Sequence, residues 1–107
     1  MDAAALFDEL TAAVGEEPDV TVPDDAGRSG FGSTTLKVDG RIFAMLVGGE
    51  LVLKLPRDRV TALIDGGAGR PFANGKGQPM REWVVLTSTQ PDVAVALGRE
   101  ALAFVRG

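Results

Sequence analysis

The chain has 107 residues, of which 45% are hydrophobic and 24% are charged, which fits one globular domain with a single hydrophobic core. It contains no cysteine, histidine or tyrosine, so disulfides, zinc–thiolate sites and the commonest general base are excluded. We therefore expect no enzymatic activity, no cofactor and no metal. No apolar run approaches the roughly 18 residues of a membrane span, and the acidic N-terminus lacks the basic region of a signal peptide. These features predict a cytoplasmic protein.

The net charge of −4 is unevenly distributed. Residues 1–27 contain eight acidic and no basic residues, whereas residues 28–107 contain eleven basic and seven acidic residues. Non-specific nucleic-acid binding needs a strongly basic surface, which the whole chain lacks, so nucleic acid is not favoured as a partner. The mildly basic remainder leaves two interpretations open: it binds a local anionic partner, or the acidic segment lies against it.

The N-terminal part predicts a helix followed by a connector. Apolar residues recur at helical spacing over residues 2–14, and Gly15 follows them, so we expect a helix over residues 1–15. Residues 16–32 are rich in proline, glycine and acidic residues and predict an acidic connector with a brief extended piece at Val20 and Val22. The pair Asp24–Asp25 within it is typical of a solvated turn, because an oxygen cage for a metal needs several spaced ligands.

Three short strands follow, separated by two turns. Residues 33–38 alternate between polar and apolar, Asp39–Gly40 is typical of a two-residue hairpin turn, and residues 42–47 are apolar throughout. Gly48–Gly49 predicts a second turn, and residues 50–55 predict the third strand.

The two turns together determine which side chains share a face of the sheet. A two-residue turn at Asp39–Gly40 pairs Leu36 with Phe43, and one at Gly48–Gly49 pairs Leu46 with Leu51. Apolar side chains then occupy both faces. Either an extra residue such as a β-bulge realigns the faces, or both faces are covered, in which case a homodimer or a protein partner covers the second one.

The second half predicts a helix, a loop, one or two strands and a final helix. Pro56 begins a short helix that Gly66–Gly67 ends. Residues 66–79 form a glycine-rich loop that lacks the spacing of a phosphate-binding loop. Residues 80–87 predict a strand, and an apolar stripe at Val93, Leu97, Ala101, Phe104 and Val105 predicts the last helix.

Few side chains are candidates for a functional site. Lys54 lies between leucines just before Pro56, and together with Arg41, Lys76 and Arg81 it could bind a small anion or a nucleic-acid phosphate. The alternative is an ordinary lysine facing the edge of the sheet. Trp83, the single tryptophan, completes the candidate binding residues, although a lone tryptophan is more typical of packing than of base stacking.

The order of several short segments resembles the N-terminal domain of the TfoX/Sxy competence-regulator family over roughly residues 30–105. These segments are Phe31–Gly32, Leu36–Ala44, Leu53–Pro56, Pro71–Phe72 and Met80–Val84. The resemblance implies a two-layer α/β sandwich of the secretion-chaperone-like kind, with an antiparallel sheet and helices on one face. It also implies no enzymatic activity and an association with the regulation of DNA uptake. Longer family members carry a C-terminal domain, which we do not expect here.

We therefore expect one α+β domain over residues 1–107, with the order α-β-β-β-α-β-β-α and with sheet and covering helices over residues 33–107. The predicted function is a non-enzymatic protein-interaction or regulatory module, including a role in transcription regulation. Binding of a small anion or a nucleic-acid phosphate through Lys54 is the alternative. An enzyme that uses a carboxylate–lysine pair is the third, and no spacing in the sequence supports it.

Overall fold

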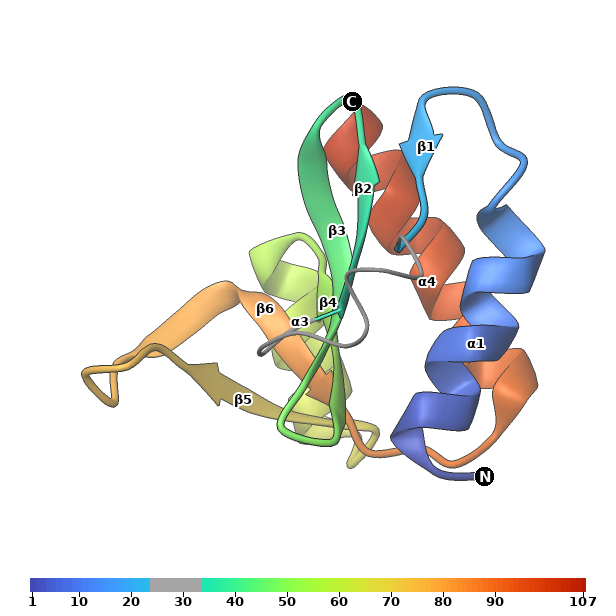
Figure 1. The fold of residues 1–107 in the computed structure, drawn as a ribbon. Coiled ribbons are helices and arrows are strands. Elements are labelled where there is room, and N and C mark those ends of the chain that lie inside the picture. Colours follow the sequence, from blue (N-terminus) through green and yellow to red (C-terminus); the bar gives the residue numbers. More distant parts are fainter. Residues whose placement is uncertain (24–33) are drawn as a thin grey trace.

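In the residues that the structure describes, the chain folds as three helices packed on a six-stranded antiparallel sheet (Figure 1). The computed structural model describes residues 1–23 and 34–107, so Asp24–Asp25 and Ser33 lie outside the described residues. The strand order is β1-β2-β3-β4-β6-β5, and no helix of the described residues is long and apolar enough to cross a membrane. The elements are α1 (Ala3–Val14), β1 (Val20–Thr21), β2 (Thr34–Val38), β3 (Arg41–Val47), β4 (Glu50–Lys54), α3 (Arg57–Asp65), β5 (Gly69–Ala73), β6 (Pro79–Leu86) and α4 (Pro91–Arg106).

The predicted α+β class and the placement of helices on one face of an antiparallel sheet are confirmed. The order differs from the prediction by one element, because the extended piece in the connector is a short edge strand, β1. The predicted order counts two strands after the second helix, but residues were assigned only to the later one, and the glycine-rich segment of residues 66–79 was predicted as a loop. Residues Gly69–Ala73 of this segment form β5, which pairs with β6.

Helices α1 and α4 lie side by side on one face of the sheet (Figure 1). The side chain of Asp2 caps α1 by accepting a hydrogen bond from the N–H of Ala5 at 2.9 Å, and Leu6, Phe7 and Leu10 are buried beneath the helix. The two helices meet at Gly98 of α4, where a Cβ atom would lie 2.2 Å from Cδ1 of Leu10. The absence of a side chain at this position therefore allows the close approach.

A β-bulge in β3 decides which residues face the helices. Both turns of the meander contain two residues with positive φ, as a type I′ turn requires. The register shifts between Leu36 and Lys37, so that Leu36 lies opposite Ala44 and Phe43 is the extra residue. The predicted pairing of Leu36 with Phe43 is therefore wrong, and the bulge that we considered as an alternative is present. As a result, Phe43 and Ala44 both join the core below the helices.

The opposite face of the sheet carries a row of side chains that run across four strands. Met45, Val52, Val85 and Arg70 are successive partners in the register. Val52 and Val85 are only 0% and 2% exposed in the single chain, and Arg70 forms an ion pair with Glu50. The centre of this face is thus buried without a second chain. The prediction of a partner on this face stays a prediction.

The β5–β6 hairpin projects from the body of the molecule (Figure 1). Its tip is closed by Asn74, whose side-chain oxygen accepts hydrogen bonds from the N–H groups of Lys76 at 2.8 Å and Gln78 at 3.0 Å. Because one side chain binds two backbone groups of the loop, the tip has a defined conformation and presents Lys76 at the far end of the hairpin.

Candidate functional site

Three of the five predicted binding residues line one cavity, which we call the Lys54 pocket. Its volume is about 440 Å³, and it lies between the start of β3, the end of β4, the middle of β6 and the end of α4. Arg41, Lys54 and Trp83 belong to it, as the sequence grouped them. The lining consists of Gly40, Arg41, Ile42, Lys54, Trp83, Phe104 and Val105.

The bulge in β3 helps to explain why a cavity forms at this place. The ladder between β3 and β4 extends only to the pair of Ala44 with Leu53, whereas β4 and β6 stay paired through Lys54 and Trp83. The start of β3 and the end of β4 are therefore not joined by ladder hydrogen bonds. The last turns of α4 supply Phe104 and Val105 to the same cavity.

Lys54 and Trp83 form the centre of the pocket. They are direct cross-strand neighbours, and Nζ of Lys54 lies 5.3 Å from the centre of the indole ring. This distance is within the range of a cation–π interaction, which contributes ~0.5–1 kcal/mol at a partly exposed site. The contact holds the ammonium group over the ring face, and both side chains are half-buried.

The pocket is positively charged and partly apolar. Among residues 1–23 and 34–107, no acidic residue lines it, and no carboxylate lies within ion-pair distance of Arg41 or Lys54. Its remaining walls are the side chains of Ile42, Trp83 and Phe104 together with Val105. Such a surface can bind a molecule that joins an anionic group to a flat or apolar body.

Among the residues that the structure describes, the charged side chains that line the pocket are one arginine and one lysine. Within the described part of the chain, no three His, Cys, Asp or Glu side chains form a group that could hold a metal ion. The arrangement is suited to binding by charge and contact.

The other two predicted residues lie outside this pocket. Arg81 borders a second hollow of about 350 Å³ between α3 and the β5–β6 hairpin. Trp83 lines both hollows. Lys76 lies at the tip of the hairpin and lines neither of them. Of the five predicted residues, three therefore line the Lys54 pocket, Arg81 lines the neighbouring hollow, and Lys76 lies apart from both.

Sequence reasoning assigned Phe104 and Val105 only to the buried stripe of the last helix. Phe104 is half-buried and Val105 is buried, and both also line the Lys54 pocket. Their spacing gave no signal of this second role, because it depends on how α4 crosses the sheet. The sequence gives one weak indication that Phe104 could line a pocket: it is a large aromatic residue next to the buried positions of that stripe.

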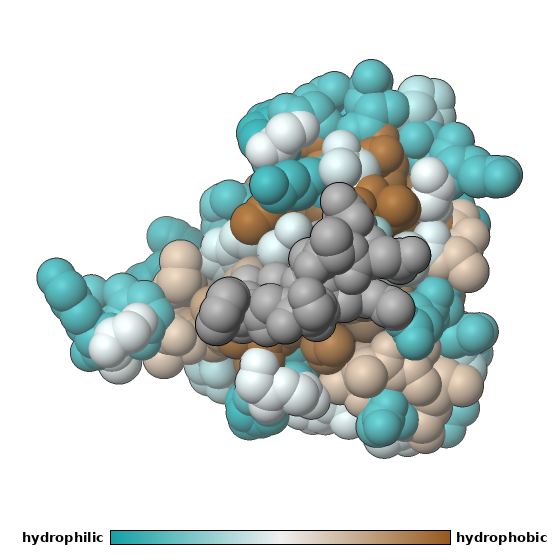
Figure 2. All heavy atoms as spheres, viewed as in Figure 1, coloured by the Kyte–Doolittle hydropathy of each residue, from teal (hydrophilic) through white to brown (hydrophobic). Residues whose placement is uncertain are grey.

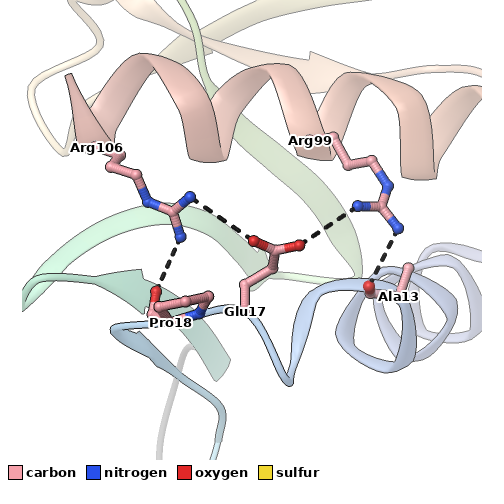
Figure 3. A network of polar contacts seen from close by, with 5 residues as sticks. All are labelled: Ala13, Glu17, Pro18, Arg99 and Arg106. Carbon is pink, nitrogen blue, oxygen red and sulfur yellow. Dashed lines mark hydrogen bonds and ion pairs between the residues drawn. The ribbon is translucent and has the colours of Figure 1, made fainter.

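A second group of cations, on α4, already has an acidic partner (Figure 3). Glu17, in the connector after α1, lies between Arg99 at 3.9 Å and Arg106 at 3.7 Å. The two guanidinium groups also donate to the backbone carbonyl oxygens of Ala13 at 3.2 Å and Pro18 at 2.9 Å. This network, which we call the Glu17 clasp, confirms for Glu17 that the acidic segment lies against the basic body.

Arg59 of α3 is likewise paired, with Glu100 of α4 at 2.9 Å. The hydrogen bond and the charge of this carboxylate raise the pKa of the Arg59 guanidinium. Arg59 therefore stays charged at every physiological pH, and its charge is used within the fold. Arg41 and Lys54 differ from these arginines in having no such carboxylate partner among the described residues.

Comparisons with known proteins supply no relative from which a ligand could be transferred. No protein-family model, no curated protein and no solved structure matches this chain.

Proposed function

We propose that this chain is a non-enzymatic binding module whose Lys54 pocket takes a small organic anion with a flat or apolar body. The observation that supports the proposal is the pairing of two cations with two aromatic side chains in a cavity that is lined by no acid of the described residues. Lys54 is held over Trp83 by the cation–π contact, so the ammonium group is oriented before a ligand arrives. Such preorganisation lowers the entropy lost on binding.

The expected affinity is modest. Two charge-assisted contacts and the partial burial of one ring supply several kcal/mol, from which the loss of translational and rotational freedom is subtracted. We expect a dissociation constant in the range of about 10 μM to 1 mM for a simple monoanionic ring compound.

Two further parts of the prediction enter the proposal. The resemblance to the TfoX/Sxy N-terminal domain favours a regulatory role for the ligand-bound module. A protein partner on the second sheet face is the alternative function, and the half-buried apolar side chains of Met45 and Val47 on that face support it. Nucleic acid is disfavoured by the net charge of −4.

The single tryptophan gives a direct test. Phenyl phosphate is titrated into the full chain while Trp83 fluorescence is recorded, with inorganic phosphate and phenol as reference compounds. We expect saturable binding of phenyl phosphate and weaker binding of either fragment. Lys54→Gln and Arg41→Gln each weaken binding by about tenfold, which corresponds to ~1.4 kcal/mol.

Lys76→Gln is the matched control, since Lys76 carries the same charge but lies outside the pocket. It leaves the dissociation constant unchanged. The proposal fails if phenyl phosphate gives no saturable signal up to about 10 mM, or if Lys76→Gln weakens binding as much as Lys54→Gln does. Calorimetry with the same compounds checks that a fluorescence change reports binding.

A further inference from the structure

The second hollow, between α3 and the β5–β6 hairpin, is an apolar groove with cations at its rim. We call it the Met80 groove. Met80 is 37% exposed and is the one large hydrophobic side chain with this exposure in residues 34–107. The groove is lined by Arg57, Asp58, Val60, Thr61, Ile64, Pro71, Pro79, Met80, Arg81 and Trp83.

The floor of the groove is suited to an apolar side chain of moderate size. Its volume of about 350 Å³ lies within the range of small ligand sites. Val60 is buried, while Ile64 and Trp83 are half-buried. The flexible thioether of Met80 adapts to different shapes, as methionines do at peptide-binding surfaces.

Binding by addition of a strand is disfavoured at this place. β5 is an edge strand of the sheet, but Pro71 within it has no N–H to donate, and prolines on edge strands obstruct pairing with another chain. A partner is therefore held here by its side chains.

The rim indicates the charge of the partner. Arg57 and Arg81 line the groove from α3 and β6, and neither has an ion-pair partner within 4.0 Å in the described parts of the chain. Among the described residues, Asp58 is the one acid in the lining. The excess of positive charge around an apolar floor is complementary to an apolar side chain flanked by carboxylates.

We propose that the Met80 groove docks a short acidic peptide segment, with one large apolar side chain in the groove and flanking carboxylates on Arg57 and Arg81. A peptide is favoured over single-stranded nucleic acid because the floor is mainly aliphatic, with Trp83 as its one aromatic side chain, whereas bases need several stacking surfaces. This site is additional to the Lys54 pocket and does not depend on it, although Trp83 borders both.

The three methionines provide the readout. The full chain is labelled with ¹³C-methyl methionine, and the Met80 signal is assigned with Met80→Leu. The probe is an acetylated and amidated pentapeptide of two glutamates, a leucine and two glutamates. We expect the Met80 methyl signal to shift saturably, while Met45 on the sheet and Met1 at the N-terminus stay in place.

Matched variants separate this site from the Lys54 pocket. Arg81→Gln and Arg57→Gln weaken peptide binding by about fivefold or more, as the loss of an ion pair at an apolar rim predicts. Lys54→Gln leaves peptide binding unchanged, and Arg81→Gln leaves phenyl phosphate binding unchanged. A peptide with serine in place of leucine, or with glutamines in place of glutamates, binds at least about fivefold more weakly.

Several results would overturn the proposal. One is a Met80 signal that does not move with the pentapeptide, and another is binding that ignores the leucine-to-serine change. A shift of the Met80 signal on dilution without peptide would assign the groove to a second copy of the chain. A larger shift with oligothymidylate than with the peptide would assign it to nucleic acid.

Discussion

The close approach of α1 and α4 at Gly98 gives the sharpest test of the packing. In Gly98→Ala the new methyl group lies 2.2, 2.6 and 2.9 Å from three side-chain atoms of Leu10, far inside the ordinary contact distance of about 3.5–4.0 Å. Leu10 is fully buried, so it has little room to move aside. Overpacking of this kind destabilises a protein by ~1–3 kcal/mol.

The helix propensity of alanine works in the opposite direction. Replacing glycine by alanine inside a helix stabilises it by ~1 kcal/mol when nothing is in the way. Because three Leu10 atoms are too close, we expect the overpacking to cost an amount near the upper end of its range. The net fall in the free energy of unfolding is then about 1–2 kcal/mol. The midpoint of thermal unfolding then falls by roughly 5–15 °C.

Urea unfolding of four proteins measures this effect: the native chain, Gly98→Ala, Leu10→Ala and the double variant. Leu10→Ala alone destabilises by ~2–5 kcal/mol, because it leaves a cavity. In that background the clash is gone, so Gly98→Ala becomes stabilising by up to ~1 kcal/mol. The exposed Ala96→Gly in the same helix measures the propensity term by itself. A Gly98→Ala effect of the same sign in both backgrounds would refute the reasoning.

The remaining predictions concern a clasp and a turn. Glu17→Gln removes the charge between two half-exposed arginines, so we expect the free energy of unfolding to fall by less than ~1 kcal/mol, and by less still in high salt. Urea unfolding at two salt concentrations measures this change. A salt-independent fall of more than ~2 kcal/mol would contradict a surface ion-pair network. Gly40 has a φ of +78°, and a Cβ atom added to it would meet nothing within 4 Å. Gly40→Ala therefore lowers the free energy of unfolding by ~1–2 kcal/mol through backbone strain alone, whereas Gly40→Asn lowers it by less. Equal stability of the two variants would contradict a type I′ turn.

The sequence predicted the fold well where the signal is local. The i, i+3, i+4 spacing predicted α1, and the Asp39–Gly40 and Gly48–Gly49 pairs predicted two turns that the structure contains. The bulge at Phe43 could be posed only as an alternative, because its position depends on packing against the helices. β5 was not recognised because Gly69 and Pro71 disfavour strands. It forms because its cross-strand partners in β6 supply the pairing.

The candidate site was predicted in part. Lys54, Arg41 and Trp83 come together in one pocket, whereas the position of Lys54 beside Pro56 was a reason to single out that lysine alone. The sequence could not separate Lys76 from this group, because that lysine is distant only through the projection of its hairpin. The contribution of Phe104 was hidden as well, since the crossing of α4 over the sheet is a tertiary property.

The bulge at Phe43 makes the length of the β2–β3 hairpin more critical than the identity of its residues. Side chains alternate between the two faces of a strand, so the loss of a single residue inverts the orientation of everything on one side of it. A one-residue deletion at position 43 would keep Leu36 opposite Ala44 and Lys37 opposite Ile42, but it would remove Phe43, which is fully buried. A deletion at a regularly paired position, such as Met45, would instead turn the residues on one side of it to the opposite faces of the sheet. The hairpin is therefore expected to accept many substitutions across evolution and very few insertions or deletions.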